Sequence, residues 1–310
     1  MTSGNLRGRR CWLTLFPRKT PCRDRRTGGF EKVAAGKDFW FRFWGTRGSL
    51  PAARPSTNRY GGNTPCVEVR AGGQILILDA GSGIRALGVK LQKEFAGGGI
   101  RASILFSHYH WDHIHGFPFF GPAYDPRNRF VIYGEPRGSR NVKDILSGQM
   151  VMPYFPVPLE VMQAGFEFRD VHPRDRFRIG KVLITTQALN HPGHCLSYRI
   201  HLGAKSIVYA TDTEHGSSLD TRLVEHARGA DVLIYDAAYT ERELKQGKKG
   251  YGHSTWREGV KVARAAGVGR LFLFHHEPNR DDGALAAMER AARRLFKNTS
   301  AAREMKKYQV

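Results

Sequence analysis

The chain has 310 residues, with 49 Lys and Arg against 28 Asp and Glu, and a formal net charge of +21. A hydrophobic content of 41% is enough to build a core, which excludes a chain that is disordered throughout. No apolar run approaches the ~20 residues that cross a bilayer, which excludes an integral membrane helix. The four cysteines are widely spaced and form no CxxC pair, which argues against a disulfide scaffold and favours the reducing cytoplasm.

The positive charge is concentrated at the two ends of the chain. Residues 1–38 carry ten basic and three acidic side chains, and residues 290–310 carry seven basic and one acidic. The first segment is rich in Gly, Pro and Arg and has no strand or helix period, so we expect a basic, disordered extension over 1–38. Three interpretations of it remain open: an arm for an anionic partner, a mitochondrial-type leader, or an extension that results from an early start codon.

From Asp38 onwards the predicted elements alternate. Apolar runs and alternating patterns predict strands at 39–45, 66–70, 74–79, 102–108, 129–134, 181–191, 196–202, 206–212, 231–237 and 271–276. Apolar residues at helical spacing predict helices at 84–95, 219–227, 255–267 and 284–296. Because hairpin-connected strands open each half and helices follow, the pattern predicts an α+β fold of packed sheets with helices outside. We expect one domain over 39–297 and a basic C-terminal tail over 298–310.

The strongest chemical signal is the segment SHYHWDHIHG at 107–116, directly after a predicted strand. Side chains alternate along a strand, so His108 and His110 point the same way, and a turn then brings Asp112 and His113 to a neighbouring position. Imidazole nitrogens and carboxylate oxygens suit zinc, manganese or iron. Four such side chains within six residues could hold two metal ions side by side.

Four further predicted strands end in residues of the same chemistry. Asp79 follows one strand, His191 and Asp212 end two others, and the pair His275 and His276 ends a fourth. Ligands gathered at the ends of rigid strands are what a metal site needs. The sequence therefore predicts one metal centre built from segments far apart in the chain.

With these motifs the chain resembles the metallo-β-lactamase superfamily, whose motif is HxHxDH, from about Phe39 to about Phe296. The resemblance implies a four-layer αββα sandwich, with a catalytic site at the edge between two sheets. It also implies two divalent ions, with zinc expected and Mn²⁺ or Fe²⁺ as alternatives. One ion would be held by His108, His110 and His191, the second by Asp112, His113 and His275, with Asp212 bridging both and Asp79 orienting groups of the site.

The remaining histidines have weaker assignments. His275 is preferred to His276 because the family's histidine stands three residues before a proline, and Pro278 fits that spacing. His194 competes with His191 as a ligand, although a local hydrogen bond or a place in the pocket wall is the simpler role. We expect His115 at the pocket rim or behind the ligands. Ordinary surface or internally bonded histidines are expected at His172, His201, His215 and His226.

A second motif, GHSTW at 252–256, narrows the chemistry. Thr255 and Glu258 have capping-box spacing, which predicts a helix start whose free N–H groups favour phosphate. His253 stands just before it, where it either protonates a leaving oxygen or merely packs beside the cap. The segment resembles the HST motif of ribonuclease Z and related phosphodiesterases, in which a histidine acts as a general acid oriented by a glutamate. Asp236, in the stretch YDAAY at 235–239, falls on that glutamate and is the expected orienting residue.

The resemblance to ribonuclease Z fails at one point. Its long tRNA-gripping arm lies between the third and fourth motifs, but here His191 and Asp212 are only 21 positions apart. The pattern is closer to bacterial metallo-hydrolases that carry WGTRGSxP, RYGGNTxCVEV and LILDAGSGIR, which occur here at 44–51, 59–69 and 76–85. That group is described broadly as hydrolases or cyclic-nucleotide-type phosphodiesterases.

We therefore expect a phosphodiesterase in which a metal-bridging hydroxide attacks phosphorus and His253 protonates the leaving oxygen. The substrate would be a small cyclic or linear phosphodiester, or an RNA end. The alternatives are a thioester or lactone hydrolase on the same fold, a tRNA 3′-end endoribonuclease, a nucleic-acid-binding protein that docks through its basic ends, and a diiron redox enzyme. We expect a cytoplasmic protein with no membrane partner, and a homodimer by resemblance alone.

Two further features carry open alternatives. The apolar segment 146–158 contains three prolines and forms either a lid over the metals or a packed loop at the sheet edge. Arg47 and Arg59, in the glycine-rich N-terminal motifs, either reach a substrate phosphate or face solvent.

Overall fold

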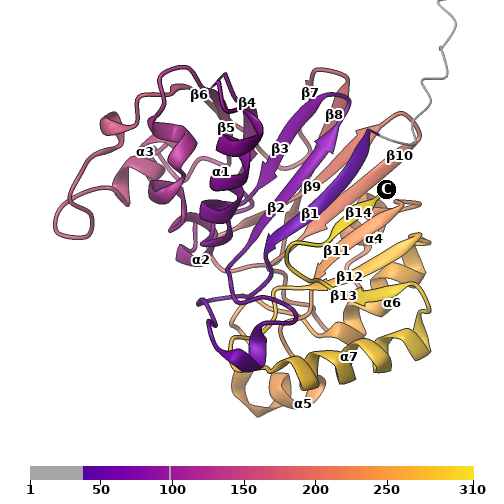
Figure 1. Cartoon of the computed structure of the whole chain (residues 1–310). Coiled ribbons are helices and arrows are strands. Elements are labelled where there is room, and N and C mark those ends of the chain that lie inside the picture. Colours follow the sequence, from indigo (N-terminus) through magenta and orange to yellow (C-terminus); the bar gives the residue numbers. More distant parts are fainter. Residues whose placement is uncertain (1–37, 98) are drawn as a thin grey trace, which may run out of the picture. The chain divides into compact units, whose positions relative to one another are not determined.

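The computed structural model describes residues 38–97 and 99–310, so the extension expected over 1–38 lies almost wholly outside the described residues. Two seven-stranded sheets dominate the described part (Figure 1). The first sheet contains β1 (Phe39–Gly45), β2 (Cys66–Ala71), β3 (Gln74–Leu78), β4 (Arg101–Leu105), β5 (Arg129–Gly134), β6 (Gly165–Asp170) and β14 (Lys307–Gln309). The second contains β7 (Arg176–Ile179), β8 (Val182–Leu189), β9 (Cys195–Leu202), β10 (Lys205–Ala210), β11 (Val232–Asp236), β12 (Arg270–Phe274) and β13 (Thr299–Ala301).

The helices lie outside the sheets. They are α1 (Gly83–Glu94), α2 (Trp111–Ile114), α3 (Val142–Gly148), α4 (Thr221–Ala227), α5 (Glu241–Glu243), α6 (Trp256–Ala266) and α7 (Asp282–Leu295). Short 3₁₀ segments occur at Pro55–Thr57, Phe117–Phe119, Gly121–Tyr124 and Leu159–Val161, and a π turn at Leu244–Lys248. Among the described residues no helix combines the length and the apolar composition that crossing a membrane requires.

Three apolar layers hold the sheets and helices together. Between the sheets, the alternation along β1 buries Phe41 and Phe43 against Phe272 of β12, with ring centroids 5.2 and 5.4 Å apart. On the outer face of the first sheet Leu87 of α1 belongs to a second buried cluster, and on the outer face of the second sheet Val260 of α6 belongs to a third. The order helix, sheet, sheet, helix confirms the predicted four-layer α+β sandwich.

Strand directions decide where the strand ends meet. The strands β3 to β6 run parallel, and so do β10 to β13. In the second sheet β9 is antiparallel to both β8 and β10, so β8 points the same way as β10. Because the carboxyl ends of parallel strands lie at one edge of a sheet, the residues that follow β3, β4, β8, β10, β11 and β12 are drawn to common edges.

The structure differs from the sequence prediction at the C-terminus. The expected tail over 298–310 contributes a strand to each sheet: Thr299 pairs with Leu271, and Tyr308 pairs with Phe41. Tyr308 is buried, with its ring 5.3 Å from that of Phe41. These three-residue strands are too short for a periodic signal, and the two lysines directly before Tyr308 made the segment look solvent-exposed.

Glu304, between these two strands, is a half-buried acid. Its carboxylate accepts hydrogen bonds from the backbone N–H of Asn63 at 2.7 Å and from Asn63 Nδ2 at 3.0 Å. Burial outweighs these bonds and raises the pKa of Glu304 from 4.5 to about 7. The folded state therefore binds this proton more tightly than the unfolded state, so the contribution to stability is complete below the unfolded pKa and is lost as the pH rises towards 7.

We therefore expect Glu304→Gln to reduce the fall in melting temperature between pH 5 and pH 8, because the variant has no carboxyl to ionise there. Thermal unfolding across that pH range is the measurement. Glu160→Gln, at an exposed position, is the control and should follow the wild type. An unchanged slope in Glu304→Gln would contradict the assignment.

Candidate metal centre and active site

Three of the predicted site residues occupy an unusual backbone conformation at strand ends. Asp79 follows β3, Asp212 follows β10 and His275 follows β12, and their φ angles are 60°, 50° and 57°. Positive φ is uncommon for residues other than glycine and is held only where the surrounding structure enforces it. The chain thus turns sharply after each strand.

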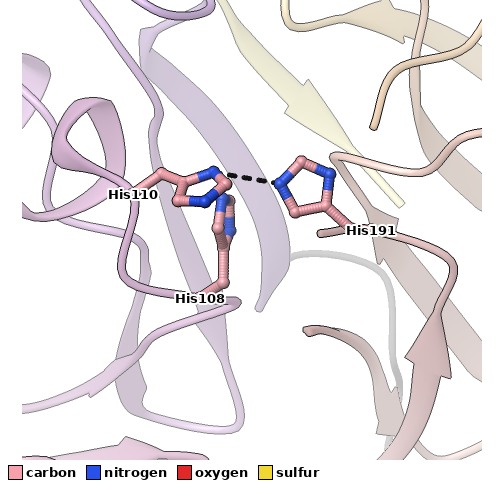
Figure 2. Close-up of side chains that lie close together, drawn as sticks. All are labelled: His108, His110 and His191. Carbon is pink, nitrogen blue, oxygen red and sulfur yellow. Dashed lines mark hydrogen bonds between the residues drawn. The ribbon is translucent and has the colours of Figure 1, made fainter. Parts of the chain in front are cut away.

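The first group of side chains consists of His108, His110 and His191 (Figure 2). His110 Nδ1 lies 3.0 Å from His191 Nε2, and the nearest nitrogens of all three residues lie within 4.8 Å of one another. His191 Nδ1 lies 2.8 Å from the carbonyl oxygen of Gly252, so this nitrogen carries the proton and Nε2 keeps its lone pair. Burial lowers the pKa of all three imidazoles, which favours the neutral form that binds metals.

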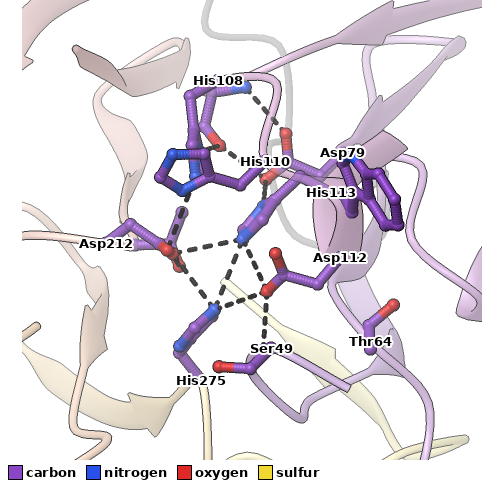
Figure 3. Close-up of polar contacts among 12 residues, drawn as sticks. Ser49, Thr64, Asp79, His108, His110, Asp112, His113, Asp212 and His275 are labelled. Carbon is purple, nitrogen blue, oxygen red and sulfur yellow. Dashed lines mark hydrogen bonds and ion pairs between the residues drawn. The ribbon is translucent and has the colours of Figure 1, made fainter. Parts of the chain in front are cut away.

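The second group consists of Asp112, His113 and His275 (Figure 3). His275 Nε2 lies 3.1 Å from Asp112 Oδ2, and His113 Nε2 lies 3.3 Å from both Asp112 Oδ2 and His275 Nε2. The backbone N–H of Ser49 donates to Asp112 Oδ2 at 2.8 Å. Gly48 lies against the His275 ring, since a Cβ at that position would come within 2.2 Å of it.

Asp212 stands between the two groups. Its Oδ2 is 3.6 Å from His108 Nε2, while its Oδ1 is 3.3 Å from His113 Nε2 and 3.4 Å from His275 Nε2. Burial by itself would raise the pKa of Asp212, but His275, His113 and His108 around it hold the pKa well below its usual value. One carboxylate oxygen therefore faces each group, as a bridging ligand requires.

Asp79 lies behind the second group. Its buried carboxylate accepts hydrogen bonds from Ser107, through the backbone N–H at 2.7 Å and Oγ at 2.8 Å, and from the Tyr209 hydroxyl at 2.7 Å. It also lies 2.8 Å from His113 Nδ1. That contact keeps the proton on Nδ1 and leaves Nε2 of His113 free to face the cluster.

The side chains present fit two divalent ions. Imidazole nitrogens approach one another at 3.0 and 3.3 Å in two places, and the buried Nε2 of His108 has no hydrogen-bond partner among the described residues. Such convergence of lone pairs is unfavourable unless a cation lies between them. The donor set contains nitrogen and oxygen but no sulfur, which suits zinc, manganese or iron.

His253 and Asp236 form a pair beside the cluster. His253 Nδ1 lies 2.8 Å from Asp236 Oδ2, and the His253 ring stacks on that of His275 with centroids 4.7 Å apart. Asp236, at the end of β11, is held in turn by the backbone N–H groups of Thr213 and Ala238. Burial alone would lower the pKa of His253, but the carboxylate of Asp236, helped by more distant acids, raises it to about 9.

The helix after His253 begins as expected. Thr255 is the N-cap of α6, and its Oγ1 accepts from the Glu258 backbone N–H at 3.2 Å. The Glu258 carboxylate pairs with Lys261 at 2.8 Å instead of returning to the cap. Half of the expected capping box is therefore formed.

Both alternatives for Arg47 are wrong. Its guanidinium is fully buried and donates to the carbonyl oxygens of Gly61 at 2.8 Å and Arg280 at 2.6 Å. It therefore joins the glycine-rich N-terminal loop to the segment after β12. Arg59 is exposed and lies over the Tyr60 ring, 5.3 Å from its centroid.

The other histidines lie outside the cluster. His276 Nε2 points to the Ala302 carbonyl oxygen at 2.9 Å, so His275 is the one that faces the site. His194 is exposed near Glu135, and His115 is half-buried, with its Nδ1 2.7 Å from the carbonyl oxygen of Trp111.

The remaining expectations concern His215 and the predicted lid. His215 Nδ1 lies 2.8 Å from Ser254 Oγ, so it is an internally bonded histidine. No residue of 146–158 lines the cavity beside His253, and Met152 and Tyr154 in that segment are exposed.

Glu214 is a residue that sequence reasoning missed. Its carboxylate accepts from the backbone N–H groups of Gly250 at 2.9 Å and Gly252 at 2.8 Å. Its own backbone exchanges hydrogen bonds with Asn190, each at 2.7 Å. The carbonyl oxygen of Gly252 in turn accepts from His191 Nδ1. Glu214 therefore connects its own loop with the loop of His191 and the loop at 250–252. Its place two residues after Asp212 was the only signal in the sequence.

Residues 75–276 match the family model described as the beta-lactamase superfamily domain. The chain belongs to this family. The match spans both groups of the candidate metal centre, and it agrees with the resemblance drawn from the HxHxDH motif.

Curated relatives and solved structures are similar over most of the chain. Ribonuclease Z of Thermoplasma acidophilum is 26% identical over 86% of this chain and 95% of its own, and that of Haloarcula marismortui is 28% identical over 75% and 84%. The metallo-beta-lactamase fold protein YhfI from Bacillus subtilis has a TM-score of 0.66 at 22% identity, over 88% of this chain and all of its own. Human tRNase Z, short form, has a TM-score of 0.60 at 17% identity, over 87% and 99%.

We expect Asp79→Asn to weaken metal binding by about 10- to 100-fold, because an amide cannot hold the His113 proton as a carboxylate does. Metal affinity measured by competition with a chelator checks this. Glu68→Gln removes another buried carboxylate, one bonded to Trp44 and Arg70 away from the site, and should leave metal affinity unchanged. Equal effects in the two variants would contradict the role of Asp79.

Glu214→Ala should lower the affinity for the metal ion at the group that contains His191 by about tenfold. The reason is that the backbone N–H groups of Gly250 and Gly252 lose the carboxylate that accepts their hydrogen bonds. Glu214→Gln retains one acceptor oxygen and should lose less. Metal content and turnover are measured on both variants, with Glu225→Ala on the exposed face of α4 as the control. A metal-replete and fully active Glu214→Ala would show that the clamp is dispensable.

Proposed function

We propose that this protein is a two-metal phosphodiesterase with His253 as its general acid. The observation that carries the proposal is the pair of His253 and Asp236 beside the metal-type cluster. The ring of His253 stacks on that of His275 and lines the neighbouring cavity. Metal ligands alone are compatible with many hydrolytic reactions on this fold. A protonated histidine beside them is specifically suited to protonating a leaving alkoxide oxygen.

The proposed division of ligands follows the geometry of the cluster. His108, His110 and His191 would hold one ion, Asp112, His113 and His275 would hold the other, and Asp212 would serve as a ligand to both. We expect zinc at both positions. Two divalent ions there supply an activated water and neutralise the charge that gathers on the phosphoryl oxygens.

The protein's own residues manage the leaving group. Because Nδ1 of His253 faces Asp236, the proton available for transfer is on Nε2. The raised pKa of His253 keeps that nitrogen protonated at neutral pH. An alkoxide needs such a proton, whereas a thiolate with a pKa of ~8.5 leaves readily without one. This difference favours a phosphodiester over the thioester alternative.

The relatives support the broader class, a metal-dependent hydrolase acting on phosphoester bonds. They include several proteins named ribonuclease Z and a diphosphatase from the PhnP family, whose structure has a TM-score of 0.64 at 19% identity. An RNA end is therefore the second candidate substrate. The segment 191–212 consists mainly of β9, a turn and β10, so it leaves no room for a long tRNA-gripping arm. A cytoplasmic location and a homodimer stay predictions.

We expect His253→Ala to lower kcat by about 10²- to 10⁴-fold on a dinucleoside monophosphate, whose ribose oxygen leaves poorly. The loss should be much smaller on bis(4-nitrophenyl) phosphate, since nitrophenolate leaves without a proton. His172→Ala, at an exposed histidine, is the control. Equal losses on both substrates would argue against a general acid.

Metal analysis accompanies these assays, and we expect two ions per chain in both wild type and His253→Ala. A panel of bis-aryl phosphate, cyclic nucleotides, pre-tRNA and thioesters is tested in parallel. The proposal is overturned if the protein holds two ions but hydrolyses none of the phosphodiesters.

A further inference from the structure

A cavity of about 250 Å³ opens beside the proposed general acid. Its wall contains His253 and His275, together with Tyr239, Lys248 and Tyr251. The ring of Tyr239 packs edge-on against that of His253, with centroids 5.7 Å apart. The two tyrosines and the lysine belong to none of the metal-type groups and take no part in the chemistry described above. They are therefore available to recognise part of the substrate.

Lys248 brings a positive charge to this wall. Its Nζ lies 5.2 Å from the ring centroid of Tyr251 and 5.8 Å from that of Tyr239, and it forms no ion pair within residues 38–97 and 99–310. Glu277 also borders the cavity, but its carboxylate accepts from Asn279, through the backbone N–H at 2.8 Å and Nδ2 at 3.1 Å. The lining therefore contains one carboxylate, Glu277, and one lysine that forms no ion pair among the described residues, Lys248, and a negatively charged ligand would pair with this lysine.

The two tyrosines supply apolar faces on either side of that cation. Tyr239 is buried at the end of the strand segment that carries Asp236, while Tyr251 is 58% exposed. Burial raises the pKa of Tyr239 to about 12, so the ring stays neutral. Aromatic faces of this kind stack on planar rings, and each stacked base contributes ~1–3 kcal/mol.

The loop that carries Lys248 and Tyr251 is fixed to the metal centre. It turns through Gly247, Gly250 and Gly252, whose φ angles of 105°, 88° and 82° are accessible to glycine. The backbone N–H groups of Gly250 and Gly252 are held by Glu214. The positions of the cation and the ring are therefore coupled to the position of His253.

The leaving group must lie on the side of His253, since that residue protonates it. We propose that the cavity is the leaving-group subsite, and that it selects a nucleotide, which combines a planar base with a further phosphate. Tyr251 and Tyr239 contact the base, and Lys248 pairs with the phosphate. This inference rests on the proposed function and specifies its substrate.

The test measures binding to the metal-loaded protein by calorimetry. The ligands are AMP, adenosine, ribose 5-phosphate and inorganic phosphate, the last of which reports the binding of a phosphate without sugar or base. We expect AMP to bind at least tenfold more tightly than each of the others. Lys248→Met should abolish the advantage of AMP over adenosine, and Tyr251→Leu its advantage over ribose 5-phosphate.

Lys245→Met is the matched control, because Lys245 is exposed on the same turn and does not line the cavity. The subsite is refuted if AMP binds no more tightly than inorganic phosphate, or if both lysine variants weaken AMP equally. Turnover of bis(4-nitrophenyl) phosphate by the wild type is measured alongside. Turnover without AMP preference refutes the subsite alone, whereas AMP preference without hydrolysis of any diester refutes the proposed function.

Discussion

The buried carboxylate of Asp79 is the interaction on which the geometry of the site depends. It binds Ser107 after β4, Tyr209 of β10 in the opposite sheet, and His113 in the metal-type cluster. A buried carboxylate left unpaired would cost several kcal/mol, so these partners cannot separate without destabilising the fold. The same hydrogen bonds that lock the two sheets together therefore fix the orientation and the tautomer of a proposed ligand.

Around Asp79 the protein gathers several features, each of which by itself destabilises the fold. Three site residues hold a left-handed backbone, at a cost of about 1–3 kcal/mol each, and the aromatic core between the sheets supports them. Buried carboxylates and imidazoles also crowd within contact of one another. Metal ions between them would turn mutual repulsion into coordination. A protonated His253 and the ammonium group of Lys248 add further positive charge in the cavity, where an anionic ester would lie.

Much of this arrangement could be predicted from the sequence. Most strands and the helices α1, α4, α6 and α7 were predicted from local periodicity, whereas β6, β7 and α3 were not predicted. The HxHxDH segment and the polar strand ends indicated the candidate ligands that the structure brings together. The predictions failed where no local pattern exists. Tyr308 lies in a strand of three residues. Arg47 is bonded to Arg280, which is 233 positions away, and Glu214 acts through backbone groups of a distant loop.

The sequence by itself determined the chemistry of the candidate site, because residue types and short spacings can be read from short segments of the chain. Examples are the imidazoles and carboxylates at strand ends, and the histidine before a capped helix. Only the tertiary structure decided which of them meet. His113 and His275 are 162 positions apart, and they face each other because parallel strands in two packed sheets bring their carboxyl ends to one edge. The same packing placed Tyr239 and Lys248 beside His253, a juxtaposition that no periodicity within a single segment can specify.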